Sequence, residues 1–247
     1  MHKDFVKFLD TLNVNKGDTI YIASDIVRIL IFHKKEGINF LPNDLIEYFL
    51  AKIGPRGNLL FPTFSWNFCR GKGFSYKDTP SESGSLTKIA MNRGDFIRTK
   101  HPMYSFAVKG KDQELLFNLD DESGWGPNSL FAYFHKHKSK NLFIGIDYKD
   151  GFTFDHYAEE TVGVDYRYYK YFTGEYTDRY GSKSTKKYKK YVRAINEKLD
   201  EILIKKNAYK KKYFKDIYFG MIDMKISGDI MIDDIKNQGG LIYEKKI

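Results

Sequence analysis

Two short segments of the sequence, 58–62 and 142–146, are apolar at nearly every position, and they limit the fold more than any other feature. Strands without polar alternation are typical of a sheet that helices cover on both faces. A third apolar segment at 19–23 and amphipathic helical patterns at 5–12 and 42–53 complete an alternating order of helices and strands. We therefore predict an α/β fold in three layers, with a mixed central sheet and helices on both faces.

The rest of the chain is less regular. Residues 63–127 form a long stretch rich in Gly, Ser and Pro with a helical piece at 85–92, and loops of this length are usually functional. Residues 184–215 carry apolar side chains three to four positions apart, which predicts an amphipathic helix with a lysine-rich outer face. Residues 219–232 alternate apolar and polar side chains, which predicts a hairpin or strand pair. With no internal repeat or linker evident, we expect a single domain over residues 1–247.

The composition is that of a folded protein. The chain has 247 residues, of which 42% are hydrophobic and 17% aromatic, and this excludes disordered and collagen-like classes. No run approaches the roughly 18 apolar residues of a membrane-spanning helix, and the first residues show no signal-segment pattern, so we expect a cytoplasmic protein. Cys69 has no second cysteine with which to form an intramolecular disulfide or a zinc site.

The formal net charge of +9 is unevenly distributed. Residues 1–160 contain 21 Lys and Arg against 20 Asp and Glu, whereas residues 161–247 contain 20 against 12. Within 183–215 there are 13 basic and 3 acidic residues. A general enrichment in lysine would spread along the chain, so this local excess indicates an anionic partner.

The candidates for chemistry reduce to histidines. The sequence contains neither a P-loop, a G-x-G-x-x-G pattern nor a G-x-S-x-G elbow. His101 precedes Pro102, which favours an extended backbone, and it lies either in a loop over a site or in a polar turn. Four others stand in polar segments and are expected at the surface, namely His2, His33, His135 and His137.

His156 follows the apolar strand predicted at 142–146. Ligands bind at the carboxyl ends of strands in open α/β sheets. If a helix begins near Thr153 or Asp155, Glu159 and Glu160 share a face with His156. A carboxylate there can orient the imidazole and raise its basicity. The alternative interpretation is a partly exposed histidine paired with surface acids.

Six segments, taken in order, resemble the aminoglycoside 3-N-acetyltransferase family. The resemblance covers roughly residues 5–166, and the family usually has a histidine in place of Ala23 and often a serine in place of Asp25. The segments are GDTI with the IAS turn (17–24), GPRGNLLFPTFS (54–65), TPSESGSL (79–86), RTKHP with a following serine (98–105), GPNS (126–129) and TFDHYAE (153–159).

The resemblance implies acetyl transfer from acetyl-CoA, used as co-substrate without a metal, directly to a sugar amine. His156 is then the general base and Glu159 the carboxylate that orients it, with Glu160 or Asp150 as substitutes. Backbone N–H groups near Ser24 or Thr63 are candidates for stabilising the oxyanion. The candidate cofactor-binding residues are Ser24, Thr63, Arg98, Lys100 and Ser105, and the candidate substrate-binding residues are Glu82, His101, Asp150 and Glu160.

Residues 167–247, where the resemblance fades, are interpreted as a variable, basic acceptor-side region. Because aminoglycosides are polycations, this basic excess favours an anionic acceptor, and we hypothesise a nucleotide-linked amino-deoxysugar for surface polysaccharide. The alternative acceptor is an aminoglycoside, which would confer antibiotic resistance. Nucleic-acid binding through the lysine-rich segment and an inactive binding role remain further alternatives. We expect no nucleic-acid or membrane partner, and a homodimer is possible.

Overall fold

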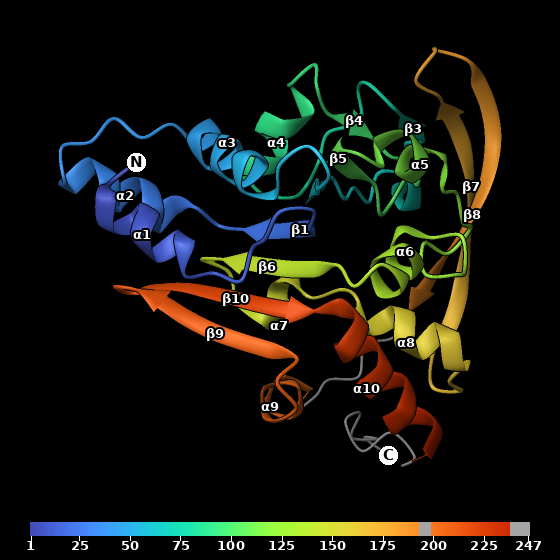
Figure 1. The fold of residues 1–247 in the computed structure, drawn as a ribbon. Helices are drawn as coiled ribbons and strands as arrows, with labels where there is room; N and C mark the ends of the chain where they lie inside the picture. The colour runs from blue at the N-terminus through green and yellow to red at the C-terminus, as the bar shows by residue number, and fades with distance from the viewer. Residues whose placement is uncertain (193–198, 238–247) are drawn as a thin grey trace.

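The computed structural model describes residues 1–192 and 199–237, and its largest element is a seven-stranded mixed sheet (Figure 1). Its three central strands run parallel and the outer strands pair antiparallel. The strands predicted from the apolar segments form this parallel centre. Across the sheet the order is β4 (Ile97–Arg98), β5 (Phe106–Gly110), β2 (Asn58–Pro62), β1 (Thr19–Ser24), β6 (Lys140–Ile144), β10 (Ile217–Asp223) and β9 (Tyr209–Phe214).

The carboxyl ends of β2, β1 and β6 meet at one edge of the sheet. Ser24 at the end of β1 is in register with Ile144 at the end of β6, and Pro62 ends β2 on the other side of β1. Glycine is needed just after β6, because a Cβ on Gly145 would lie 2.0 Å from the carbonyl oxygen of Asp25 and its φ is +67°. The chain therefore turns tightly where ligands bind in sheets of this kind.

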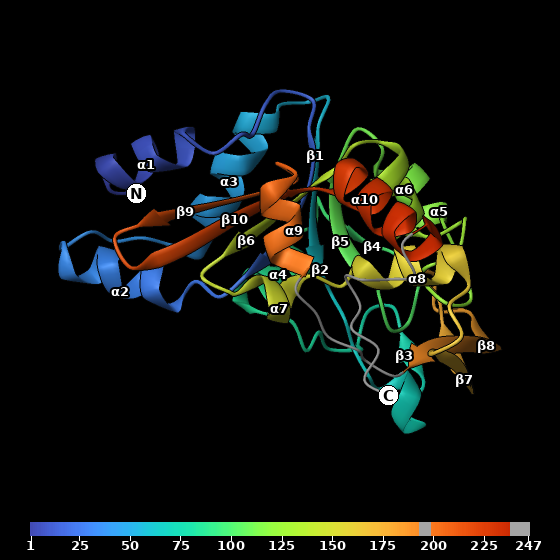
Figure 2. The same cartoon turned by 90° about the horizontal axis from the view of Figure 1, so that it is seen from below.

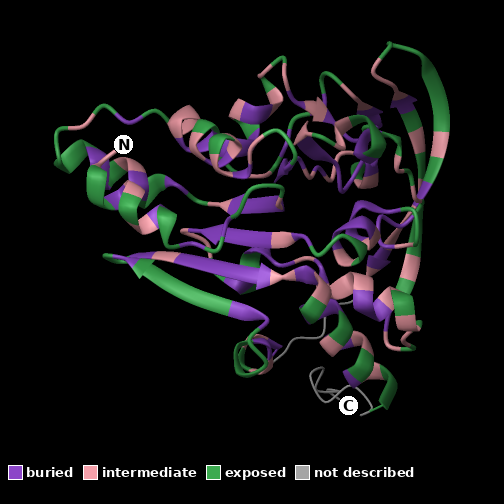
Figure 3. Cartoon of the chain, viewed as in Figure 1, coloured by how far each residue is buried: buried purple, intermediate pink, exposed green. Residues whose placement is uncertain are grey.

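Helices cover both faces of the sheet, so the predicted three-layer α/β architecture is confirmed (Figure 2). Along β1, Ile20 and Ile22 pack into one core and Tyr21 and Ala23 into the other. The first core includes side chains of α1 (Lys3–Asp10), α2 (Val27–Lys35), α3 (Pro42–Ile53) and α4 (Ser85–Met91). The second includes side chains of α5 (Gln113–Asn118), α6 (Leu130–Lys136), α7 (Tyr148–Gly151), α8 (Asp155–Val162), α9 (Leu199–Lys205) and α10 (Met224–Asn237). Figure 3 shows the central strands as the most continuously buried part of the ribbon.

The stretch 63–127 is more structured than the sequence predicted. It contains the single 3-10 turn η1 (Phe68–Arg70), the short strand β3 (Phe74–Ser75), α4, β4, β5 and α5. The strand β5 was missed because its ladder partner, β2, lies more than forty residues earlier in the chain. His33, expected at the surface, is buried and stacks on Phe40 at 4.3 Å between ring centroids.

The prediction of a lysine-rich helix over 184–215 is wrong. Residues in this range form β8 (Lys183–Val192), α9 and β9, and 193–198 lie outside the described residues. β8 pairs along its whole length with β7 (Tyr168–Thr177), and β3 adds a short third strand. Lysines of β8 pack on aromatic rings of β7 and the neighbouring loop, with Lys189 over Tyr169 and Lys190 over Trp66. Contacts with these rings, which are distant in the sequence, stabilise a strand here and not a helix. The local spacing of apolar residues does not reveal such contacts.

The prediction of a hairpin over 219–232 is wrong in its second half. β10 forms a hairpin with β9, but α10 begins directly after it. The Asp223 carboxylate accepts hydrogen bonds from the backbone N–H groups of Lys225 and Ile226, which satisfies donors that a helix start leaves unpaired. Within the described ranges, no helix combines the length and apolar character needed to cross a membrane.

Candidate active site

A cleft of about 310 Å³ opens where the carboxyl ends of the parallel strands meet. Its walls include Ser24, Pro62 and Thr153, and close approach of the α4 start is possible because a Cβ on Gly84 would lie 2.6 Å from the Ser24 carbonyl oxygen. A larger hollow of about 760 Å³ lies near Gly57, before the start of β2. That is the opposite edge of the sheet, so the smaller cleft is the better candidate on the topology of the fold.

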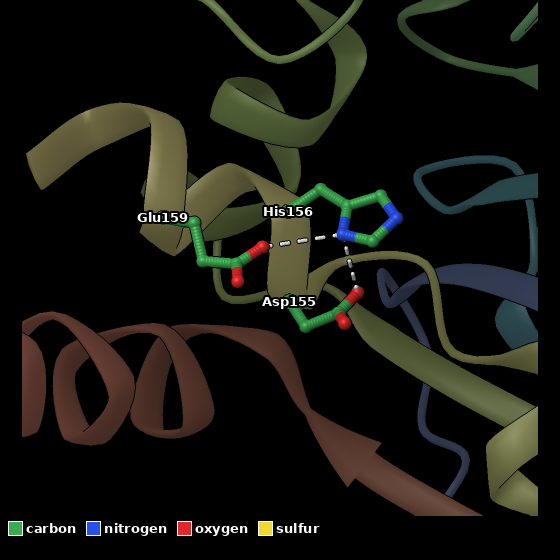
Figure 4. Close-up of side chains that lie close together, drawn as sticks. All are labelled: Asp155, His156 and Glu159. Atoms are coloured by element: carbon green, nitrogen blue, oxygen red, sulfur yellow. Dashed lines mark hydrogen bonds and ion pairs between the residues drawn. The ribbon is translucent and has the colours of Figure 1, made fainter. Parts of the chain in front are cut away.

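His156 stands in the first turn of α8, three residues after the cleft residue Thr153. Its Nδ1 lies 3.3 Å from Glu159 Oε2 and 3.4 Å from Asp155 Oδ1, whereas Nε2 points away from both carboxylates (Figure 4). The edge of the ring packs against Trp125, with 5.2 Å between centroids. Two carboxylates and an indole therefore fix the imidazole so that Nε2 is the nitrogen able to exchange a proton with a ligand.

Glu159 is fully buried, and its carboxylate lies against both the His156 ring and the Arg167 guanidinium. Its Oε2 lies 2.5 Å from Arg167 Nε, and the Arg167 side chain is only 1% exposed. The guanidinium packs over the ring of Tyr191. Sequence reasoning missed Arg167. The available signal was its residue type, because arginine is favoured over lysine for buried ion pairs and lysine dominates this part of the chain.

Asp155 is the second acid of the cluster. Burial raises the pKa of its carboxyl above the usual range, although the nearby His156 opposes the shift. The ligating atoms of Asp155, His156 and Glu159 lie within 4.8 Å of one another, a spacing that could hold a metal ion. Arg167 already places a positive charge against Glu159, and this disfavours a second cation at the cluster.

Among the other predicted acids, Glu82 and Asp150 line the cleft. Glu82 is held in place by the backbone N–H of Trp66 and by a bidentate bond from Arg70, and the first of these contributes most to lowering its pKa. In the described part of the chain, these carboxylates are the only charged groups in the cleft wall. Because the Arg70 pair offsets the charge of Glu82, the acidic character of the cleft wall comes mainly from Asp150.

Glu160 does not contact His156. It accepts a hydrogen bond from the hydroxyl of Ser123 at 2.6 Å, and burial raises its pKa. His101 is also buried. Its Nδ1 accepts hydrogen bonds from the backbone N–H groups of Met103 and Tyr104, and burial lowers its pKa to about 4. Both residues serve the packing around the site in this structure.

The predicted cofactor residues separate into three places. Ser24 lines the cleft, while Thr63 and Ser105 are buried and joined by a 2.7 Å hydrogen bond between their hydroxyls. Arg98 is buried beside them: it donates to Ser105 and to the carbonyl oxygens of residues 63 and 79, and burial lowers its pKa to about 10. Lys100 lies in a different hollow, over the ring of Phe117.

The fold and the site together define an α/β protein with a histidine held by two carboxylates near the carboxyl edge of its sheet. A family model described as aminoglycoside 3-N-acetyltransferase matches residues 33–231. Since this is more than half of the chain, the protein belongs to that family, as the resemblance predicted. It is accordingly a CoA-dependent N-acetyltransferase, with acetyl-CoA as co-substrate.

Solved structures agree with this assignment. Aminoglycoside acetyltransferase AAC(3)-Xa matches with a TM-score of 0.79 and 15% identity, over 96% of this chain and 93% of the other. AAC-IIIb, in a binary structure with CoASH, matches with 0.78 and 15%, over 94% and 95%. AAC-VIa, bound to sisomicin, matches with 0.78 and 18%, over 95% and 97%. At these identities the similarity establishes the fold, as a single domain. A comparison with curated protein sequences found no match.

Proposed function

We propose that this protein transfers the acetyl group of acetyl-CoA to a primary amine of an aminoglycoside-type amino sugar. The observation that carries the proposal is the geometry of His156, whose Nδ1 faces two carboxylates while its Nε2 points away from them. The family assignment supports the donor and the reaction. The nucleotide-linked amino sugar favoured from the sequence has no support from the comparisons, which agree better with the aminoglycoside alternative.

In the proposed reaction, the amine nitrogen attacks the thioester carbonyl carbon. His156 Nε2 takes a proton from the amine as the C–N bond forms, and the C–S bond then breaks. The proton held on His156 passes to the departing thiolate, so the products are the amide and CoA. Glu159 and Asp155 stabilise the imidazolium that exists between these steps.

The acidic cleft supports a polycationic acceptor. Glu82 and Asp150 are complementary to ammonium groups, and no lysine or arginine is present among the described residues that line the cleft. The basic excess of the C-terminal part lies elsewhere. On the hairpin, lysines pack over aromatic rings, and on the edge strand β9, exposed Lys210–Lys212 are typical of charge that blocks edge-to-edge pairing. The net charge of residues 167–247 therefore says little about the acceptor.

The region 167–247 nevertheless contributes to the site in this proposal, because Arg167 and Tyr191 support the catalytic cluster. Both suggested sources of oxyanion donors contain an N–H group that is already used: after Ser24, the Asp25 N–H donates to the Ile144 carbonyl oxygen at 2.8 Å. The backbone N–H of Thr63 already donates to the Ser105 carbonyl oxygen at 2.8 Å, so it is not available to the reacting carbonyl. A homodimer stays a prediction from the sequence.

The test is thiol release from acetyl-CoA with a panel of acceptors. Sisomicin and apramycin should be acetylated efficiently, and nucleotide-linked amino-deoxysugars should not. Glu82→Gln should raise the KM for the aminoglycoside several-fold and leave the KM for acetyl-CoA unchanged. Glu36→Gln is the matched control, because Glu36 is similarly exposed and also paired with a cation, but lies away from the cleft. Turnover of nucleotide-linked sugars alone would overturn the proposed acceptor.

A further inference from the structure

A second hollow of about 330 Å³ lies between the turn of the β7–β8 hairpin and α5. We propose that it is a binding site for a phosphorylated nucleoside, separate from the acetyl-transfer cleft. Its volume falls in the range of small-molecule sites. The residues that carry the proposal are Lys100, Arg179, Lys186, Asp178, Asp120 and Tyr180.

Two cations of this hollow are poorly neutralised. Lys100 Nζ lies 4.9 Å and the Arg179 guanidinium carbon 4.3 Å from the centre of the Phe117 ring, so the two charges are less than 10 Å apart. The Arg179 side chain is 26% exposed, and its carboxylate partner, Glu114, is 3.4 Å away and 67% exposed. Among the described residues, Lys100 donates only to the neutral amide oxygen of Asn118, at 3.3 Å. A phosphate within reach of both cations would add charge-assisted hydrogen bonds to these two long contacts.

The third cation is neutralised from within the site. Lys186 Nζ pairs with Asp120 at 3.3 Å, and both side chains are about one-third exposed. The same carboxylate accepts a hydrogen bond from the Tyr188 hydroxyl. Three cations against Asp120 and Asp178 give the lining a formal net charge of +1, which suits one phosphate group better than a polyanion.

The remaining groups suit the sugar and base of a nucleotide. Asp178 Oδ1 accepts hydrogen bonds from the backbone N–H groups of Tyr180 and Ser182, while Oδ2 makes none with any residue in the described ranges. A carboxylate oxygen of this kind accepts hydrogen bonds from ribose hydroxyls. The Tyr180 side chain is 76% exposed beside Arg179, so it offers a ring face on which a base can stack.

The hollow at the β7–β8 turn is called the nucleotide hollow from here on. Among the described residues, it shares no lining residue with the acetyl-transfer cleft. The segment that begins with β4 separates them: Arg98 directs its side chain to the Thr63 carbonyl oxygen, and Tyr76 in the nucleotide hollow accepts a hydrogen bond from the Arg98 backbone N–H. Two ligands would bring a phosphorylated nucleoside to this hollow: a free nucleotide, and CoA through its nucleotide end. Titration with AMP in the absence and presence of CoA distinguishes them.

The test is isothermal titration of the full chain with AMP. We expect saturable binding at one site, weakened at least tenfold by Arg179→Ala and by Lys100→Ala. Lys183→Ala is the matched control, because Lys183 lies on the same hairpin, is 68% exposed and is outside the hollow, so it should not change the affinity. The melting temperature of each variant verifies that it folds. Absence of saturable binding, or equal loss in Arg179→Ala and Lys183→Ala, would overturn the proposal.

A second titration is made with saturating CoA present. Retention of AMP binding supports a free nucleotide as the occupant. Displacement of AMP supports the nucleotide end of CoA, provided that Arg179→Ala raises the KM for acetyl-CoA and not that for acetyl-pantetheine. Displacement without that change in KM means that AMP was bound in the acetyl-transfer cleft, and the proposal is then wrong. The acetylation assay is read separately, so failure here leaves the proposed function intact.

Discussion

The buried pair of Glu159 and Arg167 allows the orienting role of the carboxylate to be separated from its contribution to stability. Glu159→Gln preserves the size of the side chain but removes its charge. Arg167, 1% exposed, is then left as a buried cation without its 2.5 Å carboxylate partner. Breaking a buried ion pair by removing one partner costs about 3–5 kcal/mol, which is a large part of the stability of a typical domain. We expect urea unfolding to show a loss of this size.

The double variant Glu159→Gln, Arg167→Met removes both charges. Replacing a buried ion pair by uncharged groups of similar volume is often neutral, so most of the lost stability should return. Activity should not return, because His156 still lacks the carboxylate 3.3 Å from its Nδ1. In both variants we expect thiol release to fall by about 10²-fold, the low end of what general-base catalysis contributes.

The outcomes that refute this reasoning are distinct. Recovery of activity together with stability in the double variant would show that Glu159 supports the fold and does not orient the base. An undiminished free energy of unfolding in Glu159→Gln would show that the ion pair does not stabilise the folded state. The pH dependence of kcat/KM, measured on the folded double variant, reports whether the protonation of His156 has changed.

Three further predictions concern the surroundings of the site. Arg98→Ala should destabilise the protein by about 2 kcal/mol in urea unfolding, because it removes the donor to the Thr79 carbonyl oxygen and leaves the Thr63 carbonyl oxygen with the Ser105 hydroxyl alone; an unchanged stability with a raised KM for acetyl-CoA would instead favour a cofactor role. Burial raises the pKa of Glu160, so the folded protein binds a proton at this carboxyl more tightly than the unfolded chain does. The free energy of unfolding therefore falls as pH rises above the pKa of the unfolded chain, near 4.5. Glu160→Gln should therefore stabilise the protein more at pH 8 than at pH 4, as measured by melting temperature. Gly145→Ala should lower the melting temperature markedly, since its φ of +67° and the 2.0 Å approach to the Asp25 carbonyl oxygen both disfavour a Cβ; a wild-type melting curve would contradict this.

The parallel centre of the fold could be predicted because its information is local. Segments such as 58–62 are apolar at nearly every position, and the helix Pro42–Ile53 begins at a proline and is followed by a glycine. The same holds for the proposed catalytic pair, since His156 and Glu159 are three residues apart on a helix. Residues three positions apart on a helix lie close together in space, so their spacing in the sequence predicts the contact.

The errors fall where contacts are remote in sequence. The β8 strand depends on rings of β7 and on Trp66, and Tyr188 and Tyr191 have the spacing of a helix although both pack in a strand. Arg167 reaches Glu159 only because the chain reverses after α8. The acceptor hypothesis, which the comparisons do not support, has a related weakness, because net charge by segment does not reveal which lysines face the cleft.

Arg98 and Lys100 show a further limit of sequence reasoning. They are separated by a single residue, and both are candidate cofactor-binding residues from the sequence. In the structure, the Arg98 side chain is buried toward Thr63, whereas Lys100 lies in the hollow at the β7–β8 turn. In a continuous strand these two positions would share a face, but β4 ends at Arg98, so their side chains can separate.

We propose that His156 is the general base of an acetyl-transfer site at the carboxyl edge of the sheet. This role is tested by comparing thiol release from acetyl-CoA, with sisomicin as acceptor, for the wild type and His156→Ala. Loss of the general base should lower kcat/KM by about 10²–10⁴-fold. The melting temperature should stay close to that of the wild type, since the His156 side chain is 23% exposed. Retention of wild-type turnover by a folded His156→Ala variant would contradict the claim.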